Sequence, residues 1–232
     1  VVWQILSSTG IVPDFLLPSP VDVARAFVND FPLLMMHLKV TLLESVLGLV
    51  IGIATGFAMA VLMDYFEPFY KAFYPVVVIT QTVPAIAVAP LLVLWLGYDM
   101  APKVTLIVIV TFFPMTVGLL EGFRAADGDT MNLLKAMGAD RIQIFRHVKL
   151  PGAMDRFFAS LKISASYSVV GAVIAEWLGG YSGLGVYMTR VRKSYAFDKM
   201  FAVIFLISAI SLLLMSAVEI LQKRMMPWRT KD

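Results

Sequence analysis

Apolar stretches long enough to cross a bilayer dominate this sequence. They occupy residues 40–63, 72–96, 104–120, 161–178 and 201–221. Between them we expect a polar turn at residues 64–71, a short turn at 97–103 and a glycine-rich loop at 179–199. A transmembrane helix needs about 20 mainly apolar residues, so a chain of 232 residues has room for five such helices and their connections. Only 15% of the residues are charged, against about 25% in soluble domains. The sequence therefore predicts an all-α, polytopic membrane protein, with residues 1–232 forming a single transmembrane domain.

The residues before the first of these stretches predict two further elements. The apolar run at residues 1–6 is too short to span a membrane, and we interpret it as the end of a first helix that the sequence holds only in part. Ser19 and Pro20 predict the start of a short helix, because serine is a good N-cap and proline fits the first helical turn.

Composition excludes several kinds of site. The sequence has no cysteine, so disulfides, thiolate nucleophiles and cysteine-ligated metals are excluded. Two histidines, His37 and His147, are too few for a histidine-based metal site. The sequence lacks a Gly-x-x-x-x-Gly-Lys-Ser/Thr loop, so the chain cannot cradle the phosphates of ATP itself. We expect no metal, no catalytic residue and no nucleic acid partner.

The distribution of basic residues predicts the orientation. With residues 121–162 and the C-terminal tail placed in the cytoplasm, 12 lysines and arginines lie inside and 7 outside. Cytoplasmic loops of membrane proteins carry such an excess of positive charge. The net charge of +3 is explained in the same way and does not imply nucleic acid binding.

Two patterns concern helix packing and a solute pathway. Gly48, Gly52, Gly56 and Ala60 recur every four residues, which lets another helix approach closely, either within one subunit or at a seam between subunits. Three prolines interrupt residues 72–96, so that stretch either lines a wet pathway or is a kinked structural helix. The candidate pathway residues are Gln81, Pro84, Tyr167, Glu176 and Trp177.

The longest polar stretch, residues 121–162, predicts a helical hairpin. Leu133, Leu134 and Met137 recur at helical spacing, and Gly138 is suited to end that helix because glycine tolerates a left-handed conformation. Asp140 predicts the cap of a second helix. This second helix would carry Ile142, Phe145 and Val148 on its apolar face and would end at Leu150-Pro151. Such a hairpin either presents a rigid apolar knob to a partner or rests on lipid headgroups.

These residues carry a resemblance to a known family. Gly138, Ala139, Leu150 and Pro151 fall at the spacing of the EAA loop of ABC importer permeases, although Asn132-Leu-Leu134 replaces the usual Glu-Ala-Ala. The segments Phe15-Leu-Leu-Pro-Ser-Pro20 and Ala175-Glu-Trp-Leu-Gly-Gly180 resemble the branch that imports nitrate, sulfonates, taurine and thiamine-precursor pyrimidines.

The resemblance implies a type I-like permease fold in a bacterial inner membrane, with no enzymatic activity of its own. It implies a homodimer, an extracytoplasmic binding protein and a separate ATPase subunit that binds ATP and magnesium. The hairpin would seat in a groove of that ATPase. The residues so assigned to coupling are Leu133, Leu134, Lys135, Ala136, Met137, Gly138, Ala139, Asp140, Leu150 and Pro151.

Other functions compete with this interpretation. An ion-coupled secondary transporter would use acids within its spans. Glu44 and Glu176 are such acids, unless each accepts hydrogen bonds from nearby loop or helix-end donors. Gly180-Tyr-Ser-Gly183 matches a serine-protease string, but a serine nucleophile needs a base, and we place His37 ahead of the first full span.

The transported solute is predicted from what the spans contain. We expect no lysine or arginine in the middle of a span, whereas Phe112, Phe113, Tyr167 and Trp177 supply aromatic rings. An anion pathway would be expected to offer some positive charge. The pattern therefore favours a neutral or cationic heterocycle over nitrate, a sulfonate or taurine. The segments Ala175–Gly180 and Val186–Ala202 most resemble pyrimidine-precursor permeases, and this resemblance implies a thiamine-precursor pyrimidine as the solute.

Overall fold

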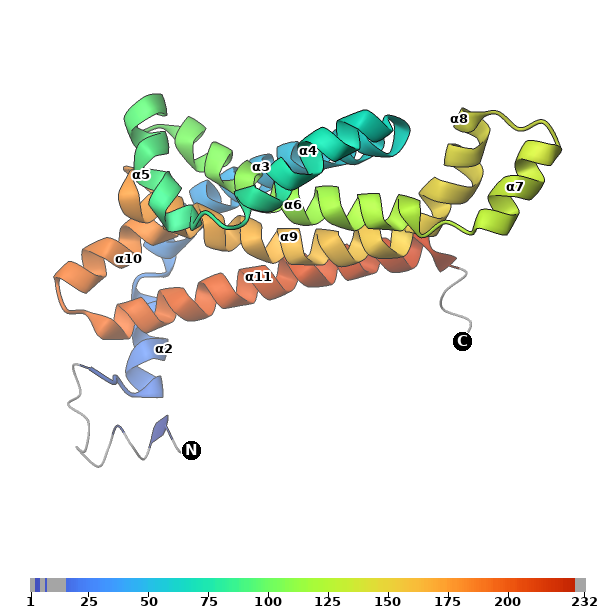
Figure 1. Ribbon diagram of the computed structural model, residues 1–232. Coiled ribbons are helices and arrows are strands. Elements are labelled where there is room, and N and C mark those ends of the chain that lie inside the picture. The colour runs from blue at the N-terminus through green and yellow to red at the C-terminus, as the bar shows by residue number, and fades with distance from the viewer. Residues whose placement is uncertain (1–2, 5–6, 8–15, 228–232) are drawn as a thin grey trace. The chain divides into compact units, whose positions relative to one another are not determined.

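The computed structural model describes residues 3–4, 7 and 16–227, and in this part of the chain helices are the only regular secondary structure (Figure 1). The helices are α2 (Pro20–Asn29), α3 (Phe31–Tyr65), α4 (Glu67–Thr80), α5 (Ala85–Leu96), α6 (Met100–Arg124), α7 (Gly128–Ala136), α8 (Arg141–Ile144), the π-helical turn η1 (Phe145–Lys149), α9 (Leu150–Leu178), α10 (Leu184–Lys193) and α11 (Phe197–Met225).

Among the described residues, four helices meet the length and composition of a membrane span, and α4 with α5 forms a bent pair that is either a fifth, broken span or a re-entrant loop. The four are α3, α6, α9 with the turns that precede it, and α11. Each of the five predicted apolar stretches thus corresponds to one of these elements, and the all-α polytopic fold is confirmed. The partial first helix predicted at residues 1–6 falls mostly on residues outside the described part of the chain.

The chain divides into two compact units. Unit 1 consists of Val1–Leu47, Ala85–Leu106 and Val169–Leu213, and unit 2 of Gly48–Pro84, Ile107–Ser168 and Leu214–Asp232. The long helices α3, α6, α9 and α11 each contribute one part to each unit.

Two predicted connections prove to be helical, so those predictions were wrong. The polar turn expected at residues 64–71 shrinks to Phe66, because Pro68 fits the first turn of a helix that resumes at Glu67. The glycine-rich loop expected at residues 179–199 contains α10, which begins directly after Gly183 and buries an apolar face. Gly183 has φ +121°, a conformation that glycine alone adopts readily, and it provides the turn before α10.

Pro151 does not end the second helix of the hairpin, contrary to the prediction. The helical path runs without interruption from Arg141 to Leu178. Proline lacks the N–H that would bond to the preceding turn, and the π-helical turn η1 lies directly before this point. There the N–H of Leu150 donates to the carbonyl oxygen of Phe145, five residues back. The wider π-helical turn thus accommodates the hydrogen bond that Pro151 cannot donate, and the helix continues.

Unit 2 has an apolar core in which α3 and α6 approach closely. Phe123, Phe158 and Met115 are among its fully buried side chains. A Cβ atom added to Gly56 would lie 2.8 Å from the Cβ of Met115 and 3.1 Å from the carbonyl oxygen of Phe112. The small-residue stripe therefore packs inside one subunit, as one of the two predicted alternatives requires.

Candidate functional site

The predicted hairpin is present and its turn is built as the sequence suggested. Asp127 caps α7 by accepting hydrogen bonds from the Thr130 hydroxyl and the N–H groups of Asp129 and Thr130, and the Thr130 hydroxyl bond is the largest cause that lowers the pKa of Asp127. Gly138 has φ +86° and follows Met137, the C-cap residue of α7. Asp140 and Gln143 then form a reciprocal capping box at the start of α8, with bonds of 2.7 and 2.8 Å.

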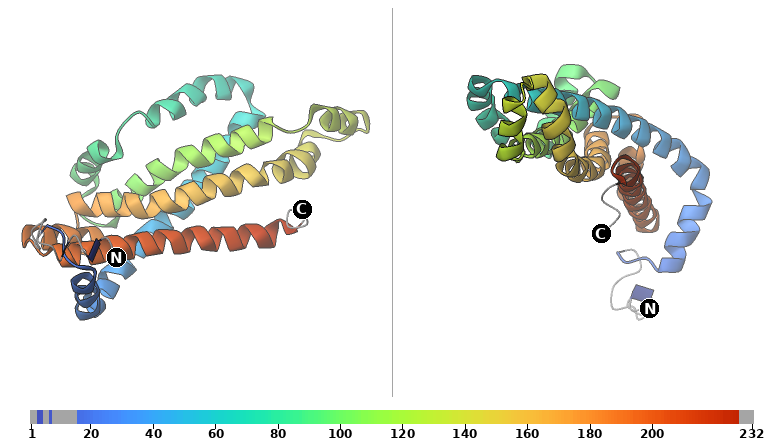
Figure 2. Two further views of the ribbon diagram at one scale, coloured as in Figure 1. Left: turned by 90° about the horizontal axis from the view of Figure 1, so that it is seen from below. Right: turned by 90° about the vertical axis from the view of Figure 1, so that its right-hand side faces the viewer.

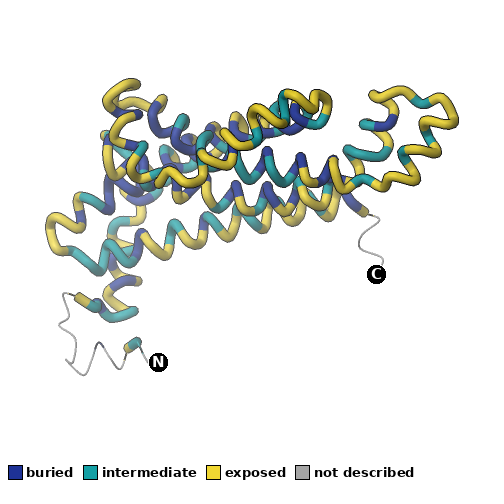
Figure 3. The backbone as a smooth tube through the Cα atoms, viewed as in Figure 1, coloured by how far each residue is buried: buried dark blue, intermediate teal, exposed yellow. Residues whose placement is uncertain are grey.

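The hairpin presents apolar side chains outward. Figures 1 and 2 show α7 and α8 beside each other, beyond the ends of the unit 2 parts of α6 and α9. Leu133 is 63% exposed, Met137 74% and Ile142 71%, and the exposed surface of α7 is visible in Figure 3. Exposed apolar side chains on a rigid projection are typical of a surface that a partner covers.

The predicted apolar face of the second helix is only partly correct. Phe145 packs on Phe123 with ring centroids 5.1 Å apart, but Ile142 points outward and Ile144 is buried in its place. The regular 3.6-residue spacing does not hold because α8 has a single turn before the π-helical geometry begins.

The ten predicted coupling residues divide between the hairpin and the core. Residues 133–136 form the last part of α7, and residues 137–140 connect it to α8. Leu134 and Ala139 line a small cavity of about 190 Å³ with Gln143 and His147. Leu150 packs against the apolar core of unit 2, and Pro151 is exposed on α9.

Unit 1 contains a buried polar cluster that connects three helices. Lys103 on α6 donates to Glu44 on α3 over 2.6 Å, and both side chains are at most 5% exposed. Glu176 on α9 accepts a 2.7 Å bond from the hydroxyl of Thr41 on α3. The carboxyl group of Glu44 also lies within interaction range of Glu176. Charged groups buried in this way are paired or hydrogen-bonded, because an isolated charge would be very costly.

The same cluster holds the N-terminus of α10. The N–H groups of Gly183, Leu184 and Gly185 donate to the Nδ1 atom of His37 (3.0 Å), the Thr41 hydroxyl (2.9 Å) and the Glu176 carboxylate (2.6 Å). The first N–H groups of a helix have no partner within the helix, and here side chains from α3 and α9 supply one. The prediction that Glu44 and Glu176 accept bonds from loop or helix-end donors is confirmed for Glu176, whereas Glu44 is paired with a lysine.

The five predicted pathway residues are divided between the two units. Glu176 and Trp177 line a pocket of about 330 Å³ in unit 1, with Tyr98 and Tyr181 at its edge. Gln81 and Pro84 belong to the exposed break between α4 and α5, and Tyr167 is half exposed on the unit 2 part of α9. Their role as a pathway remains a prediction.

The sequence reasoning missed Lys103 and misplaced His37. Lys103 was assigned to a turn, whereas it lies in the first turn of α6 and is buried. His37 belongs to α3 rather than preceding the first span, and its Nδ1 atom already accepts from Gly183. His37, Thr41 and Ser45 recur every four residues on an apolar helix. This polar stripe was the signal that could have placed His37 within the helix. The longer α9 also places Lys162 within a span, contrary to expectation.

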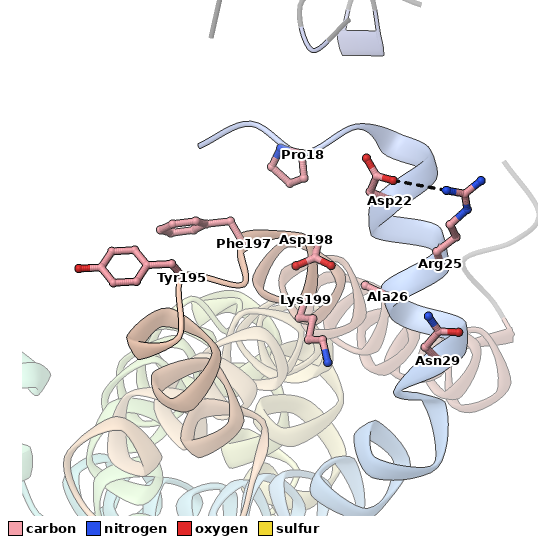
Figure 4. A pocket seen from close by; sticks show the side chains of 9 residues that line it. All are labelled: Pro18, Asp22, Arg25, Ala26, Asn29, Tyr195, Phe197, Asp198 and Lys199. Carbon is pink, nitrogen blue, oxygen red and sulfur yellow. Dashed lines mark ion pairs between the residues drawn. The ribbon is translucent and has the colours of Figure 1, made fainter. Parts of the chain in front are cut away.

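A second, larger pocket in unit 1 was not predicted. It has a volume of about 460 Å³ and lies between α2 and the turn that joins α10 to α11 (Figure 4). Tyr195 and Phe197 form one wall, and Asp22 and Arg25 on α2 form an ion pair of 3.8 Å on the opposite side. Its lining combines positive charge, negative charge and aromatic rings, so the pocket by itself does not indicate one class of ligand.

Comparison with known proteins identifies the family. The family model described as "Binding-protein-dependent transport system inner membrane component" matches residues 48–227. The chain therefore belongs to this family and is a permease subunit of an ABC importer. It is a multi-pass protein of a bacterial inner membrane and is not an enzyme.

Individual relatives agree with this assignment. The chain is 34% identical to a probable ABC transporter permease protein of Haemophilus influenzae, covering 96% of this chain and 91% of the relative. It is 35% identical to the formylaminopyrimidine transport permease protein ThiX of Halalkalibacterium halodurans, covering 100% and 93%. It is 28% identical to the putative aliphatic sulfonates transport permease protein SsuC of Bacillus subtilis, covering 98% and 83%.

A solved structure shows the same fold. The chain resembles a chain of the MetNI methionine ABC transporter in an inward-facing conformation, with a TM-score of 0.73 at 17% identity, covering 84% of this chain and 97% of that one. Permease subunits of this family bind no cofactor themselves, since a partner ATPase handles ATP, and the family implies an extracytoplasmic binding protein as a further partner. Within the described residues, no group of three or more histidines and acids could hold a metal ion.

Proposed function

We propose that this permease moves a small heterocyclic solute into the cell, and that the α7–α8 hairpin couples that movement to ATP hydrolysis by the partner ATPase. The observation that carries the coupling role is the exposed apolar surface of Leu133, Met137 and Ile142 on a hairpin with rigid caps. Helices that are capped in this way can move as a unit when a partner subunit moves, because their ends cannot fray without breaking the cap hydrogen bonds.

The tight turn of the hairpin provides the test. Proline at position 138 cannot adopt φ +86° and loses the N–H that donates to Lys135, so Gly138→Pro should distort the turn between α7 and α8. We expect membrane insertion to persist while ATP-driven uptake into proteoliposomes falls by at least about five-fold, as expected for loss of a coupling energy of about 1–3 kcal/mol.

A matched control lies at the other end of α7. Gly128 is the first residue of α7, and the extended backbone of Asp127 before it is compatible with a following proline. Gly128→Pro should therefore leave uptake close to that of the wild type. Normal uptake by the Gly138→Pro variant would remove the hairpin from the mechanism.

The solute is inferred from the aromatic surfaces and from the relatives. The lining of the 330 Å³ pocket includes Tyr98, Trp177 and Tyr181 together with the acid Glu176, and it contains no lysine or arginine. Aromatic rings suit a planar heterocycle. The similarity to a formylaminopyrimidine permease supports a thiamine-precursor pyrimidine.

A second candidate is a sulfonate such as taurine, because relatives named for sulfonate and taurine transport match over 98% of the chain. A thermal-shift screen of the cognate binding protein with hydroxymethylpyrimidine, taurine and nitrate separates the candidates. Stabilisation by the pyrimidine alone supports our proposal, and stabilisation by taurine or nitrate alone contradicts it.

The assembly is proposed to contain two copies of this permease, as the family resemblance implies. Mass measurement of the purified complex tests this point. Two identical permease chains with two ATPase chains are expected, whereas one copy beside a different permease would exclude the homodimer.

A further inference from the structure

A partly buried ion pair fastens the hairpin to the α3–α4 turn, by which we mean Asp64 and Tyr65 at the end of α3 together with Phe66. The Nζ atom of Lys149 donates to both carboxylate oxygens of Asp64, over 2.7 and 2.8 Å. The two side chains are only 21% and 10% exposed. A pair that is largely withdrawn from solvent is screened much less than a surface ion pair, so this contact resists separation.

The other end of the same short segment touches the same turn. Arg141, at the start of α8, lies over the ring of Tyr65 at 5.7 Å, and Tyr65 directly follows Asp64. Lys149 is the last residue of the π-helical turn, a rare geometry that occurs frequently at functional sites. Between these two contacts, Ile144 is buried. The α8–η1 segment is therefore held at both ends against the α3–α4 turn.

The α3–α4 turn leads directly to the predicted pathway. Phe66 alone separates α3 from α4, and the 14 residues of α4 form a rod about 21 Å long. The rod ends at Gln81, where the break that includes Pro84 begins. Near its start, Arg124 of α6 stacks on Tyr70 at 3.5 Å and contacts Glu67 at 3.2 Å.

We propose that the Lys149–Asp64 bond transmits the displacement of the hairpin to α4, and through α4 to the break at residues 81–84. The proposal rests on the coupling role of the hairpin given above. Lys149 and Asp64 are thus positioning residues, which act on the pathway without touching the solute. The more exposed Arg124 contact holds the start of α4 to α6 and provides the point about which α4 turns.

The test measures transport and ATP hydrolysis together. The permease is reconstituted in proteoliposomes with its ATPase and binding protein, and uptake of radiolabelled hydroxymethylpyrimidine and of taurine is measured in parallel. Asp64→Asn and Lys149→Met should lower the amount of solute moved per ATP hydrolysed by at least about five-fold, the lower end of typical coupling between sites. The amount of assembled complex and the rate of ATP hydrolysis should stay near wild-type values.

Exchange of the two charges separates transmission from folding. The double variant Asp64→Lys with Lys149→Asp should recover most of the solute moved per ATP, because it restores an ion pair between the same two positions. As a control, Arg156→Met removes a 2.7 Å ion pair with Glu121 that joins α6 to α9 and is half exposed. This control should leave the ratio unchanged.

Three results would overturn the link. These are a normal ratio in both single variants, a parallel loss of ATP hydrolysis and uptake, or a charge exchange that transports no better than the single variants. Uptake by the wild type that needs no ATP would overturn the proposed function and the link with it. ATP-driven uptake by the wild type, together with any of the three results above, would overturn the link alone.

Discussion

The two units hold their helices together by different means, and α3 takes part in both. In unit 1, α3 contributes Thr41 and Glu44 to a buried polar cluster with Lys103 and Glu176. In unit 2, the same helix contributes glycines that let α6 approach, around a core of apolar side chains. Burial of apolar surface does not favour contact between helices in lipid, so either hydrogen bonds or close packing must do so.

Because of this difference, the two units should respond differently to amino-acid substitutions. A polar cluster depends on every partner, because removing one leaves another charge or donor unsatisfied away from water. A core of small and apolar residues depends instead on volume, and it fails when a side chain no longer fits. Single substitutions in each unit test these two dependences.

Removal of Lys103 should have the largest effect. Lys103→Met leaves the Glu44 carboxylate buried without its ion-pair partner, which should cost about 3–5 kcal/mol of folding free energy. Thermal unfolding of the purified protein in detergent measures the loss. Adding Glu44→Gln should recover much of it, since the uncompensated charge is then gone. Equal stability of the single variant and the wild type would show that unit 1 does not depend on this pair.

Enlarging a stripe glycine should have the next largest effect, in unit 2. Gly56→Leu places a side chain against the Met115 side chain and against backbone atoms of Phe112 and Thr116, which cannot move aside easily. Overpacking of this kind costs about 1–3 kcal/mol. Gly128→Leu is the control, because no atom lies within 4 Å of the Cβ position there. A Gly56→Leu variant that unfolds at the wild-type temperature would refute close packing as the basis of unit 2.

The smallest effect concerns pH and the start of α3. Hydrogen bonds from Lys199 and then from Tyr187 hold the pKa of Asp30 below its ordinary value, and burial and the Asp30 bond raise the pKa of Tyr187. The carboxylate therefore contributes stability above the unfolded pKa of about 3.9. This contribution is lost as the pH falls through the lower folded value. Because Lys199 is 38% exposed, we expect less than about 1 kcal/mol.

The measurement for this prediction compares the wild type with Asp30→Asn. Unfolding temperatures recorded between about pH 6 and pH 3 should converge at the acidic end, since asparagine carries no titrating group there. A constant difference across the whole range would mean that Asp30 acts through packing and not through its charge.

The fold could be predicted because its signals are local. Apolar runs of span length, Ser19 and Pro20 at the start of α2, and Gly138 and Asp140 in the hairpin each act through neighbouring residues. The predictions for the second helix of the hairpin failed because its backbone is irregular. The π-helical turn before Pro151 carried the helix onward, and it also changed which residues of the hairpin face inward.

The candidate site could be predicted only where its residues are contiguous in sequence. The hairpin is continuous in sequence, so its residues were found together. The polar cluster joins His37, Lys103 and Glu176, which are far apart in sequence, and no spacing rule connects them. The Lys149–Asp64 pair was missed for the same reason, since 85 positions separate the two residues.

Contact between the hairpin and the ATPase is the central claim, and the absence of native cysteine allows a direct measurement. Met137→Cys places a unique thiol on the exposed turn, and a cross-linker with a maleimide and a photoreactive group can then join it to whatever lies against it. Trp95→Cys, on the exposed part of α5 in unit 1, is the matched control. We predict that the thiol at position 137 cross-links to the ATPase subunit in a transport-competent complex and that the thiol at position 95 does not. A competent complex in which position 137 never cross-links to the ATPase would contradict the account.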